Sequence, residues 1–243
     1  MNRRISLSRT AASWVCLPVL TGVFASLSMG SALCGARDLS EWSSRAWARW
    51  LLRLAGVTLE ITIDPGIDPE RTYVLVANHQ SHFDVPCLMH AWPGPVRFVT
   101  KRSLFSIPLF GQAMAAVGHI PVIRGNSAQA KAALAKAIVP LKEWASVLFF
   151  AEGTRSRDGE LKRFKKGCLA MAEAAQVPVA AVGISGIREV LPRGSGWIAP
   201  GLVRIHFGPA LEGLERMERS RGERIEILRE AVVAAIEETG SSS

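Results

Sequence analysis

Short apolar runs alternate with longer amphipathic segments from residue 57 onward. The apolar runs are rich in β-formers, so we predict seven strands: VTLEITI, TYVLVA, VRFVT, HIPVI, SVLFFA, VPVAAVGI and LVRIHF. Several runs are apolar throughout, which is typical of strands that helices cover on both sides. Near the C-terminus, Ile225, Leu228 and Val232 fall on one face of a predicted helix. This alternation predicts an α/β fold with a mixed, largely parallel sheet of about seven strands flanked by helices.

The N-terminal segment has a different pattern, because no charged residue occurs in the 27 residues from Thr10 to Ala36. A helix needs about 20 apolar residues to span a bilayer. Pro18 and Gly22 weaken this helix, and arginines flank the segment on both sides. We therefore expect a re-entrant hairpin, bent near Pro18 or Gly22, rather than a full crossing. A cleaved secretory signal is the alternative.

The next stretch, residues 41–55, has the spacing of an amphipathic helix. Its predicted apolar face has Trp47, Trp50, Leu51 and Leu54, and its basic stripe has Arg45, Arg49 and Arg53. We expect this helix to lie along a membrane surface, although packing of its tryptophans on a protein core is the alternative. The predicted organisation is a membrane-associated helical segment over 1–55 and an α/β domain over 56–240.

Composition narrows the class of partner. The chain has a formal net charge of +8 and a mean hydropathy of +0.20, which suits a peripheral or singly anchored membrane protein. The charge fits nucleic acid, an anionic membrane surface or a phosphorylated substrate. Nucleic acid is disfavoured, because the basic residues are neither interleaved with exposed aromatics nor placed on a recognition helix.

The motif NHQSHFD follows one predicted strand, where ligands bind in α/β sheets. His79 and Asp84 have the spacing of a histidine base oriented by a carboxylate, without a side-chain nucleophile beside them. His79, His82 and Asp84 are also a candidate metal-ligand set. A third interpretation is that Ser81 or Asp84 caps the following helix.

A second polar cluster, Glu152-Gly153-Thr154-Arg155, follows the run SVLFFA. A glycine turn with a guanidinium, a hydroxyl and backbone amides suits the oxygens of a phosphate. Lys101 and Arg124 each follow a predicted strand, so a parallel sheet would place both cations at the same edge. Taken alone, the cluster is also typical of a solvated basic hairpin.

Four blocks occur in order between residues 57 and 210: NHQSHFD, KRSLFSIPLFG with a later arginine, AEGTRS and VPVAAVGI. Together they resemble the 1-acylglycerol-3-phosphate acyltransferases, the lysophosphatidate acyltransferases of phospholipid synthesis. The resemblance implies transfer of a fatty acyl chain from acyl-CoA or acyl-carrier protein to the free hydroxyl of 1-acylglycerol-3-phosphate, giving phosphatidic acid. It makes His79 the general base and Asp84 its orienting carboxylate, and it requires neither a metal nor a cofactor. The residues that it assigns to the lysophospholipid acceptor are Glu152, Gly153, Thr154, Arg155, Lys101 and Arg124.

Three departures from the family pattern leave the acceptor open: Ile123, Ala151 and Ala181 stand where the family usually has Asp, Pro and Pro. Another lyso-lipid, such as lyso-ornithine lipid, is the first alternative. A metal-dependent hydrolase using His79, His82 and Asp84 is the more remote one. Because acyl thioesters are made in the cytoplasm, we expect an uncleaved chain at the cytoplasmic face of the cell inner membrane.

Overall fold

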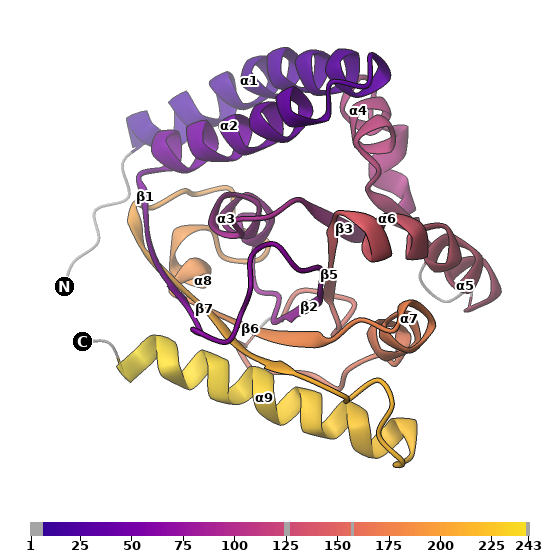
Figure 1. Ribbon diagram of the computed structural model, residues 1–243. Coiled ribbons are helices and arrows are strands. Elements are labelled where there is room, and N and C mark those ends of the chain that lie inside the picture. Colours follow the sequence, from indigo (N-terminus) through magenta and orange to yellow (C-terminus); the bar gives the residue numbers. More distant parts are fainter. Residues whose placement is uncertain (1–6, 124–126, 157, 242–243) are drawn as a thin grey trace.

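The computed structural model describes residues 7–123, 127–156 and 158–241 (Figure 1). Within these residues one seven-stranded sheet has the order β1-β7-β6-β2-β5-β3-β4. The β6–β7 pair is antiparallel and the other neighbouring pairs are parallel, which confirms the predicted mixed α/β sheet. The strands are β1 (Val57–Ile63), β2 (Val74–Ala77), β3 (Val96–Lys101), β4 (Ile120–Val122), β5 (Ser146–Phe150), β6 (Val179–Ser185) and β7 (Gly201–Leu211).

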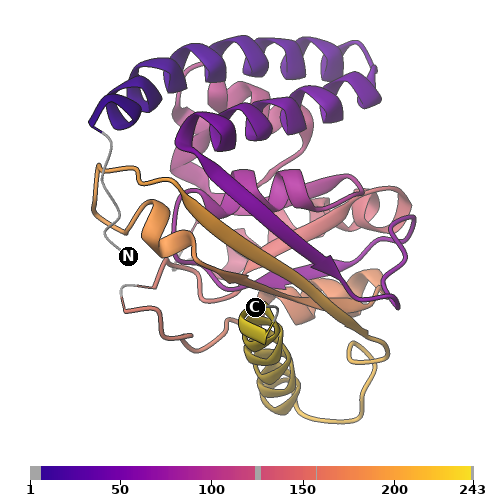
Figure 2. The same cartoon turned by 90° about the vertical axis from the view of Figure 1, so that its left-hand side faces the viewer.

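Helices cover both faces of the sheet (Figures 1 and 2). The face that includes Leu75 and Ala77 packs on α2, α3 and α8, and the face that includes Val74 and Val76 packs on α6, α7 and α9. This alternation along β2 follows from the opposite orientation of successive side chains in a strand. The helices after residue 56 are α3 (Asp84–Ala91), α4 (Phe110–Val117), α5 (Ser127–Lys136), α6 (Ile138–Glu143), α7 (Gly167–Ala175), α8 (Ile187–Val190) and α9 (Arg221–Ser241), with the 3-10 helix η1 (Arg102–Ser106).

The long helix α9 confirms the periodicity predicted near the C-terminus. Ile225, Leu228 and Val232 are buried against β6 and β7, on the opposite side of the sheet from α2 and α3. In Figure 1 this helix runs beneath the sheet.

Two N-terminal helices, α1 (Leu7–Leu33) and α2 (Arg37–Ala55), form an antiparallel hairpin above the α3 side of the domain (Figures 1 and 2). The expected bend near Pro18 or Gly22 is wrong, because α1 stays helical through both residues. The chain reverses instead at residues 34–36. Proline removes one helical hydrogen bond, and we attribute the continuity of α1 to its packing along α2.

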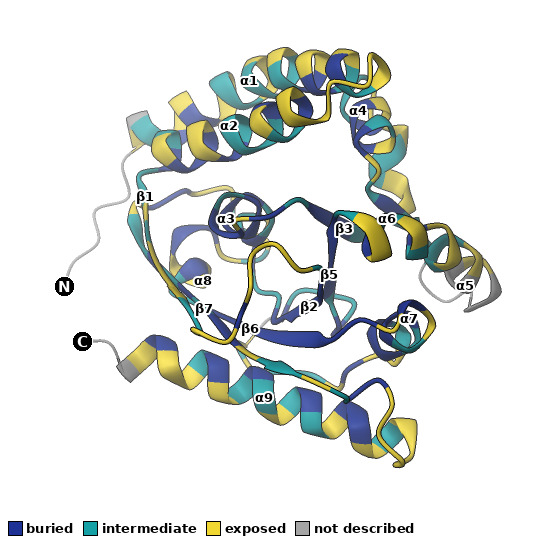
Figure 3. Cartoon of the chain, in the orientation of Figure 1, coloured by how far each residue is buried: buried dark blue, intermediate teal, exposed yellow. Residues whose placement is uncertain are grey.

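The hairpin has small polar side chains inside and large apolar side chains outside. Ser28 Oγ donates to Ser43 Oγ at 3.0 Å, and Ser40 Oγ donates to the carbonyl oxygen of Ser28 at 3.1 Å. On the outer face of α1, Val15 and Val19 are 71% and 66% exposed (Figure 3). Small residues allow two helices to approach closely, as they do in helix pairs within membranes.

By length and composition alone, α1 could cross a membrane, because Arg9–Leu33 has a mean hydropathy of 1.6 and little of it is buried. The predicted apolar face of α2 is only partly correct. Leu51 is buried, and Trp47 turns inward to donate its indole N–H to Thr21 Oγ1 at 3.1 Å. The exposed tryptophans of α2 are Trp42 and Trp50. The helical spacing could not show that part of the tryptophan face packs on the protein core.

Polar contacts attach the hairpin to the domain. Glu41 of α2 forms an ion pair with Arg97 of β3, whose side chain is 4% exposed and whose guanidinium lies over the Trp144 ring. Arg45 donates to the carbonyl oxygens of Pro93 and Gly94 at 2.5 and 2.6 Å. These contacts fix α2 above α3 and the amino end of β3.

Candidate active site

The candidate site lies at the carboxyl ends of the parallel strands β2 and β5. Ala77 is opposite Phe150 in the register of these strands, so the segments that follow them leave the sheet side by side. The first segment contains His79 and the second contains Glu152. The two motifs predicted from the sequence therefore meet, as expected at the carboxyl edge of a parallel sheet.

His79 and Asp84 form a direct pair. His79 Nδ1 lies 2.6 Å from Asp84 Oδ2, which also accepts backbone N–H groups from Gln80 and Ser81 at 2.7 and 2.9 Å. A carboxylate only accepts hydrogen bonds, so Nδ1 carries the hydrogen and Nε2 keeps its lone pair. Asp84 is fully buried at the first residue of α3, where a carboxylate is also favoured by the helix dipole. The backbone N–H groups that Asp84 accepts precede α3, and among the described residues no side chain caps this helix at its first residue, so the base-orienting interpretation describes this carboxylate better than the capping one.

Glu152 links the two motifs through their backbones. Its Oε1 accepts the N–H of His79 at 2.9 Å and its Oε2 accepts the N–H of Lys162 at 3.1 Å. Burial raises the pKa of this carboxyl group, while the two backbone hydrogen bonds act in the opposite direction. Glu152 therefore shapes the loop that presents His79, and its carboxylate oxygens are engaged with the protein rather than pointing at a ligand.

The turn after Glu152 requires glycine. Gly153 has a φ of 71°, and a side chain there would collide with Lys165. Thr154, Arg155 and Lys165 line the same cavity as His79. The carbonyl oxygen of Arg155 accepts a hydrogen bond of 2.5 Å from Arg193, which also lines the cavity.

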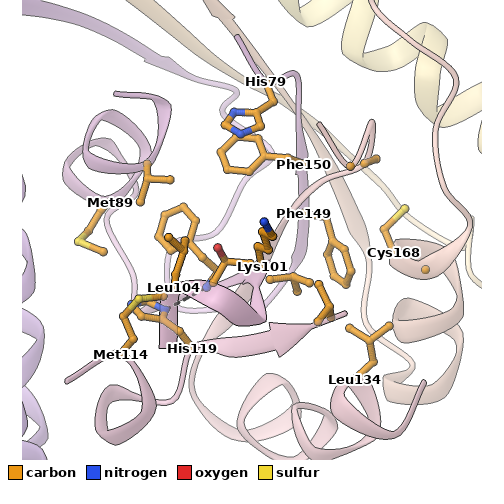
Figure 4. Close-up of a pocket in the computed structure, with 18 of the residues that line it drawn as sticks. His79, Met89, Lys101, Leu104, Met114, His119, Leu134, Phe149, Phe150 and Cys168 are labelled. Atoms are coloured by element: carbon orange, nitrogen blue, oxygen red, sulfur yellow. Dashed lines mark hydrogen bonds between the residues drawn. The ribbon is translucent and has the colours of Figure 1, made fainter. Parts of the chain in front are cut away.

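The cavity beside His79 has a volume of about 1290 Å³ and extends between the domain and the hairpin. In Figure 4, His79 lies at one end above Phe150, with Lys101 pointing into the space below. Mostly apolar residues line the remainder, including Met89, Met114, Phe149 and Leu134. The arrangement combines a proton acceptor, a group of cations and a long apolar chamber. Arg124, predicted as a further cation, lies outside the described residues.

Among the described residues, no three His, Cys, Asp or Glu side chains are grouped so as to hold a metal ion. His82 lines the cavity and its pKa is lowered, first by burial and then by the charge of Arg155. His79 directs Nδ1 to Asp84. The proposed metal set of His79, His82 and Asp84 therefore receives no support from the geometry.

Two features of the site were missed from the sequence. The Phe150 ring stacks on the His79 imidazole, with centroids 4.0 Å apart and planes 19° apart. Arg193 comes from the loop after α8, far from either motif in the chain. Phe150 lay inside an apolar run typical of a buried strand, and no local pattern distinguished Arg193 from other exposed arginines.

A sequence model of the acyltransferase family matches residues 59–185, just over half of the chain. The chain belongs to the acyltransferase family. The matched region of this acyltransferase contains β2, β5 and both motifs of the site.

Relatives of this acyltransferase have been described in several organisms. It is 33% identical over 171 residues to a 1-acyl-sn-glycerol-3-phosphate acyltransferase of Pseudomonas aeruginosa, covering 68% of this chain and 65% of that one. It is 28% identical over 199 residues to an enzyme of the same name from Borreliella burgdorferi, covering 82% and 80%. A chloroplastic relative from Brassica napus is 38% identical over 133 residues, but the match covers 54% of this chain and 38% of the relative. The chain spans about two fifths of the length of this relative and of those from Arabidopsis thaliana and Chlamydomonas reinhardtii.

A solved structure shares the fold. The acyltransferase PlsC from Thermotoga maritima superposes with a TM-score of 0.80 at 23% identity, covering 98% of this chain and 97% of that one. The superposition therefore includes the hairpin as well as the sheet.

Proposed function

We propose that this acyltransferase transfers a fatty acyl chain from a thioester to the free hydroxyl of 1-acylglycerol-3-phosphate and so makes phosphatidic acid. The observation that supports this most directly is the 2.6 Å His79–Asp84 pair, which opens onto an apolar cavity rimmed by Lys101 and Arg155. The relatives from Pseudomonas aeruginosa and Borreliella burgdorferi bear the name of this activity. We propose acyl-CoA or acyl-carrier protein as the donor.

In the proposed reaction, His79 Nε2 takes the proton of the acceptor hydroxyl as the oxygen attacks the thioester carbonyl carbon. The tetrahedral intermediate collapses with cleavage of the C–S bond, and the leaving sulfur receives the proton from the imidazolium. Asp84 holds the ring through Nδ1 and stabilises its charged form. A positioned base of this kind contributes about 10²- to 10⁴-fold to the rate.

We assign the acceptor phosphate to the cations at the cavity rim. Arg155 and Lys101 line the cavity near His79, and Gly153 allows the turn that presents Thr154 and Arg155. Glu152 supports this turn from within. The apolar walls suit an acyl chain, because hydrocarbon gains free energy when it leaves water.

For the membrane, we propose that residues 1–55 are the membrane-associated segment, residues 56–240 the acyltransferase domain, and the cytoplasmic face of the cell inner membrane the location. The outer face of α1 is apolar, and Trp42 and Trp50 are exposed on α2. Tryptophans are common at membrane–water interfaces. Such a surface places the cavity within reach of a lipid acceptor, and the net positive charge favours anionic lipids.

The test of the activity uses the purified full-length protein in mixed micelles with radiolabelled acyl-CoA or acyl-carrier protein. Lysophosphatidate and lyso-ornithine lipid are offered separately as acceptors. We expect phosphatidic acid from the wild type, loss of turnover in His79→Ala, and normal turnover in His206→Ala, which removes a histidine outside the cavity. Turnover on lyso-ornithine lipid alone would reassign the acceptor, and full activity in His79→Ala would reject the mechanism.

The location is tested by membrane fractionation, N-terminal sequencing and protease accessibility. An intact N-terminus in the membrane fraction, with the domain protected from protease added outside the cell, is the expected result. A mature chain that begins near Cys34 in a periplasmic or secreted fraction would reject it.

A further inference from the structure

A second hollow of about 400 Å³ lies between α2, β1 and the end of α3, and shares no residue with the cavity beside His79. Neighbouring residues of α3 separate the two spaces, because Met89 lines the first and His90 the second. We call this second hollow the lateral groove. Its lining residues are Arg49, Leu52, Arg53, Val57, Leu59, Ile61 and His90.

The lateral groove concentrates positive charge without a counter-charge. Within the part of the chain that the structure describes, no carboxylate forms an ion pair with Arg49, Arg53 or His90. Several other arginines are paired with glutamates, as Arg71 is with Glu212 and Arg204 with Glu60. Uncompensated charge in a hollow with low-dielectric walls attracts an anion.

Burial and the neighbouring arginines also lower the pKa of His90. The arginines that act on His90 are Arg49, Arg45 and Arg53, in that order. A neutral imidazole keeps one N–H that can donate to an anionic oxygen. The ring therefore remains a hydrogen-bond donor in the same groove as the guanidinium groups of Arg49 and Arg53.

The rest of the lateral groove is apolar and continues into an exposed apolar surface. Leu59 and Ile61 of the edge strand β1 form one wall, and Ile61 is 41% exposed. Next to the groove, the Arg53 guanidinium lies 5.6 Å from the Trp50 ring centroid, and Trp50 is 49% exposed. A ligand that fits both parts has an anionic head and a hydrocarbon body.

We propose that the lateral groove binds the phosphate head group of an anionic phospholipid in the membrane surface, separately from the catalytic cavity. Arg49 and Arg53 would contact the phosphate oxygens, because guanidinium groups form strong charge-assisted hydrogen bonds with phosphate. The wall from Leu59 to Ile61 would contact the glycerol and the start of an acyl chain. A lipid held there would tie β1 and α3 to the bilayer beside Trp50.

The test measures binding to vesicles without any acyl substrate, so its result is independent of the proposed activity. Full-length protein is floated with phosphatidylcholine vesicles and with vesicles that also contain phosphatidylglycerol. We expect wild type to prefer the anionic vesicles, and Arg49→Gln with Arg53→Gln to reduce that preference by about fivefold per arginine.

A matched pair of variants distinguishes lipid binding in the lateral groove from a general effect of surface charge. Ile61→Glu places a carboxylate in the lateral groove, whereas Thr62→Glu makes the same charge change at the next exposed residue, which points to the other face of β1. We expect Ile61→Glu to lose the preference for anionic vesicles and Thr62→Glu to keep it. Equal losses in both variants, or none in Ile61→Glu, would overturn the proposal.

The ligand itself is distinguished by competition. Inorganic phosphate is added to the wild type bound to anionic vesicles at constant ionic strength. Retention on the vesicles supports a lipid ligand. Saturable displacement by phosphate that disappears in Arg49→Gln with Arg53→Gln would assign the groove to free phosphate and overturn the lipid assignment.

Discussion

The hairpin and the catalytic edge of the sheet both bury polar side chains, but the hairpin also exposes large apolar side chains. At the catalytic edge, polar groups such as Asp84 and Glu152 are buried and bonded to the backbone around His79. In the hairpin, hydroxyl groups such as those of Ser28 and Ser43 bond to each other inside, while valines cover the outside. Buried polar groups that are hydrogen-bonded are the rule inside proteins in water, whereas polar contacts inside with large apolar side chains outside are typical of helices in lipid.

The two regions also differ in what their polar contacts do. Those of the His79 loop orient its ring through Asp84, five positions away, and hold its backbone through Glu152, 73 positions away. The ion pair that attaches the hairpin joins residues 56 positions apart in the chain. We therefore expect loss of the Asp84 contact to affect turnover first, and loss of the Glu41–Arg97 ion pair to affect stability first.

The largest expected effect is on turnover in Asp84→Asn. An amide in place of the carboxylate can donate to Nδ1 and leave Nε2 protonated, so His79 can no longer accept the hydroxyl proton. We expect kcat to fall by about 10²- to 10⁴-fold. Because the two residues act as a unit, the double variant His79→Ala with Asp84→Asn should be no slower than His79→Ala alone. Multiplicative losses in this cycle would show that Asp84 acts independently of His79.

A second comparison contrasts a buried and an exposed ion pair. Glu41→Gln leaves Arg97, with a 4% exposed side chain, without its counter-charge, and this should lower the free energy of unfolding by about 3 kcal/mol. Glu60→Gln removes the partner of the more exposed Arg204 and should cost about 1 kcal/mol or less. Denaturant unfolding in detergent measures both. Equal decreases in the free energy of unfolding in the two variants would mean that water solvates Arg97 once its ion pair is broken.

The sequence was sufficient for the sheet and the catalytic motifs because their signals are local. Five residues separate His79 from Asp84, and the rule for parallel strands brings Glu152 beside them without further information. The seven apolar runs likewise predicted the seven strands, with ends that differ by at most four residues.

The packing of the hairpin could not be predicted in this way. Pro18 and Gly22 are locally weak in a helix, and the spacing of serines within each helix does not show that Ser28 and Ser43 meet each other. The inward position of Trp47 depends on Thr21 of the other helix. The spacing of apolar residues identifies an apolar face of a helix. It does not show whether water, lipid or another part of the protein covers that face.

The next effect concerns binding at the cavity rim. Arg155→Ala should raise KM for the acceptor about ten- to hundredfold, because loss of a charge-assisted bond to phosphate costs roughly 1.5–3 kcal/mol. KM for the thioester should change little. Arg163→Ala, which removes an exposed arginine outside the cavity, is the control and should leave both values unchanged. Equal increases for both substrates in Arg155→Ala would indicate a structural role.

The smallest expected effect concerns the contact between Phe150 and His79. Phe150 stacks on His79 across 4.0 Å, and such aromatic pairs contribute about 0.5–1.5 kcal/mol. Phe150→Leu keeps an apolar side chain but removes the ring that limits rotation of the imidazole, so kcat should fall about two- to tenfold. Phe207→Leu makes the same change at a fully buried core residue outside the cavity, and should lower Tm while leaving kcat unchanged. If Phe150→Leu lowers Tm alone and kcat is retained, the Asp84 hydrogen bond is sufficient to orient His79.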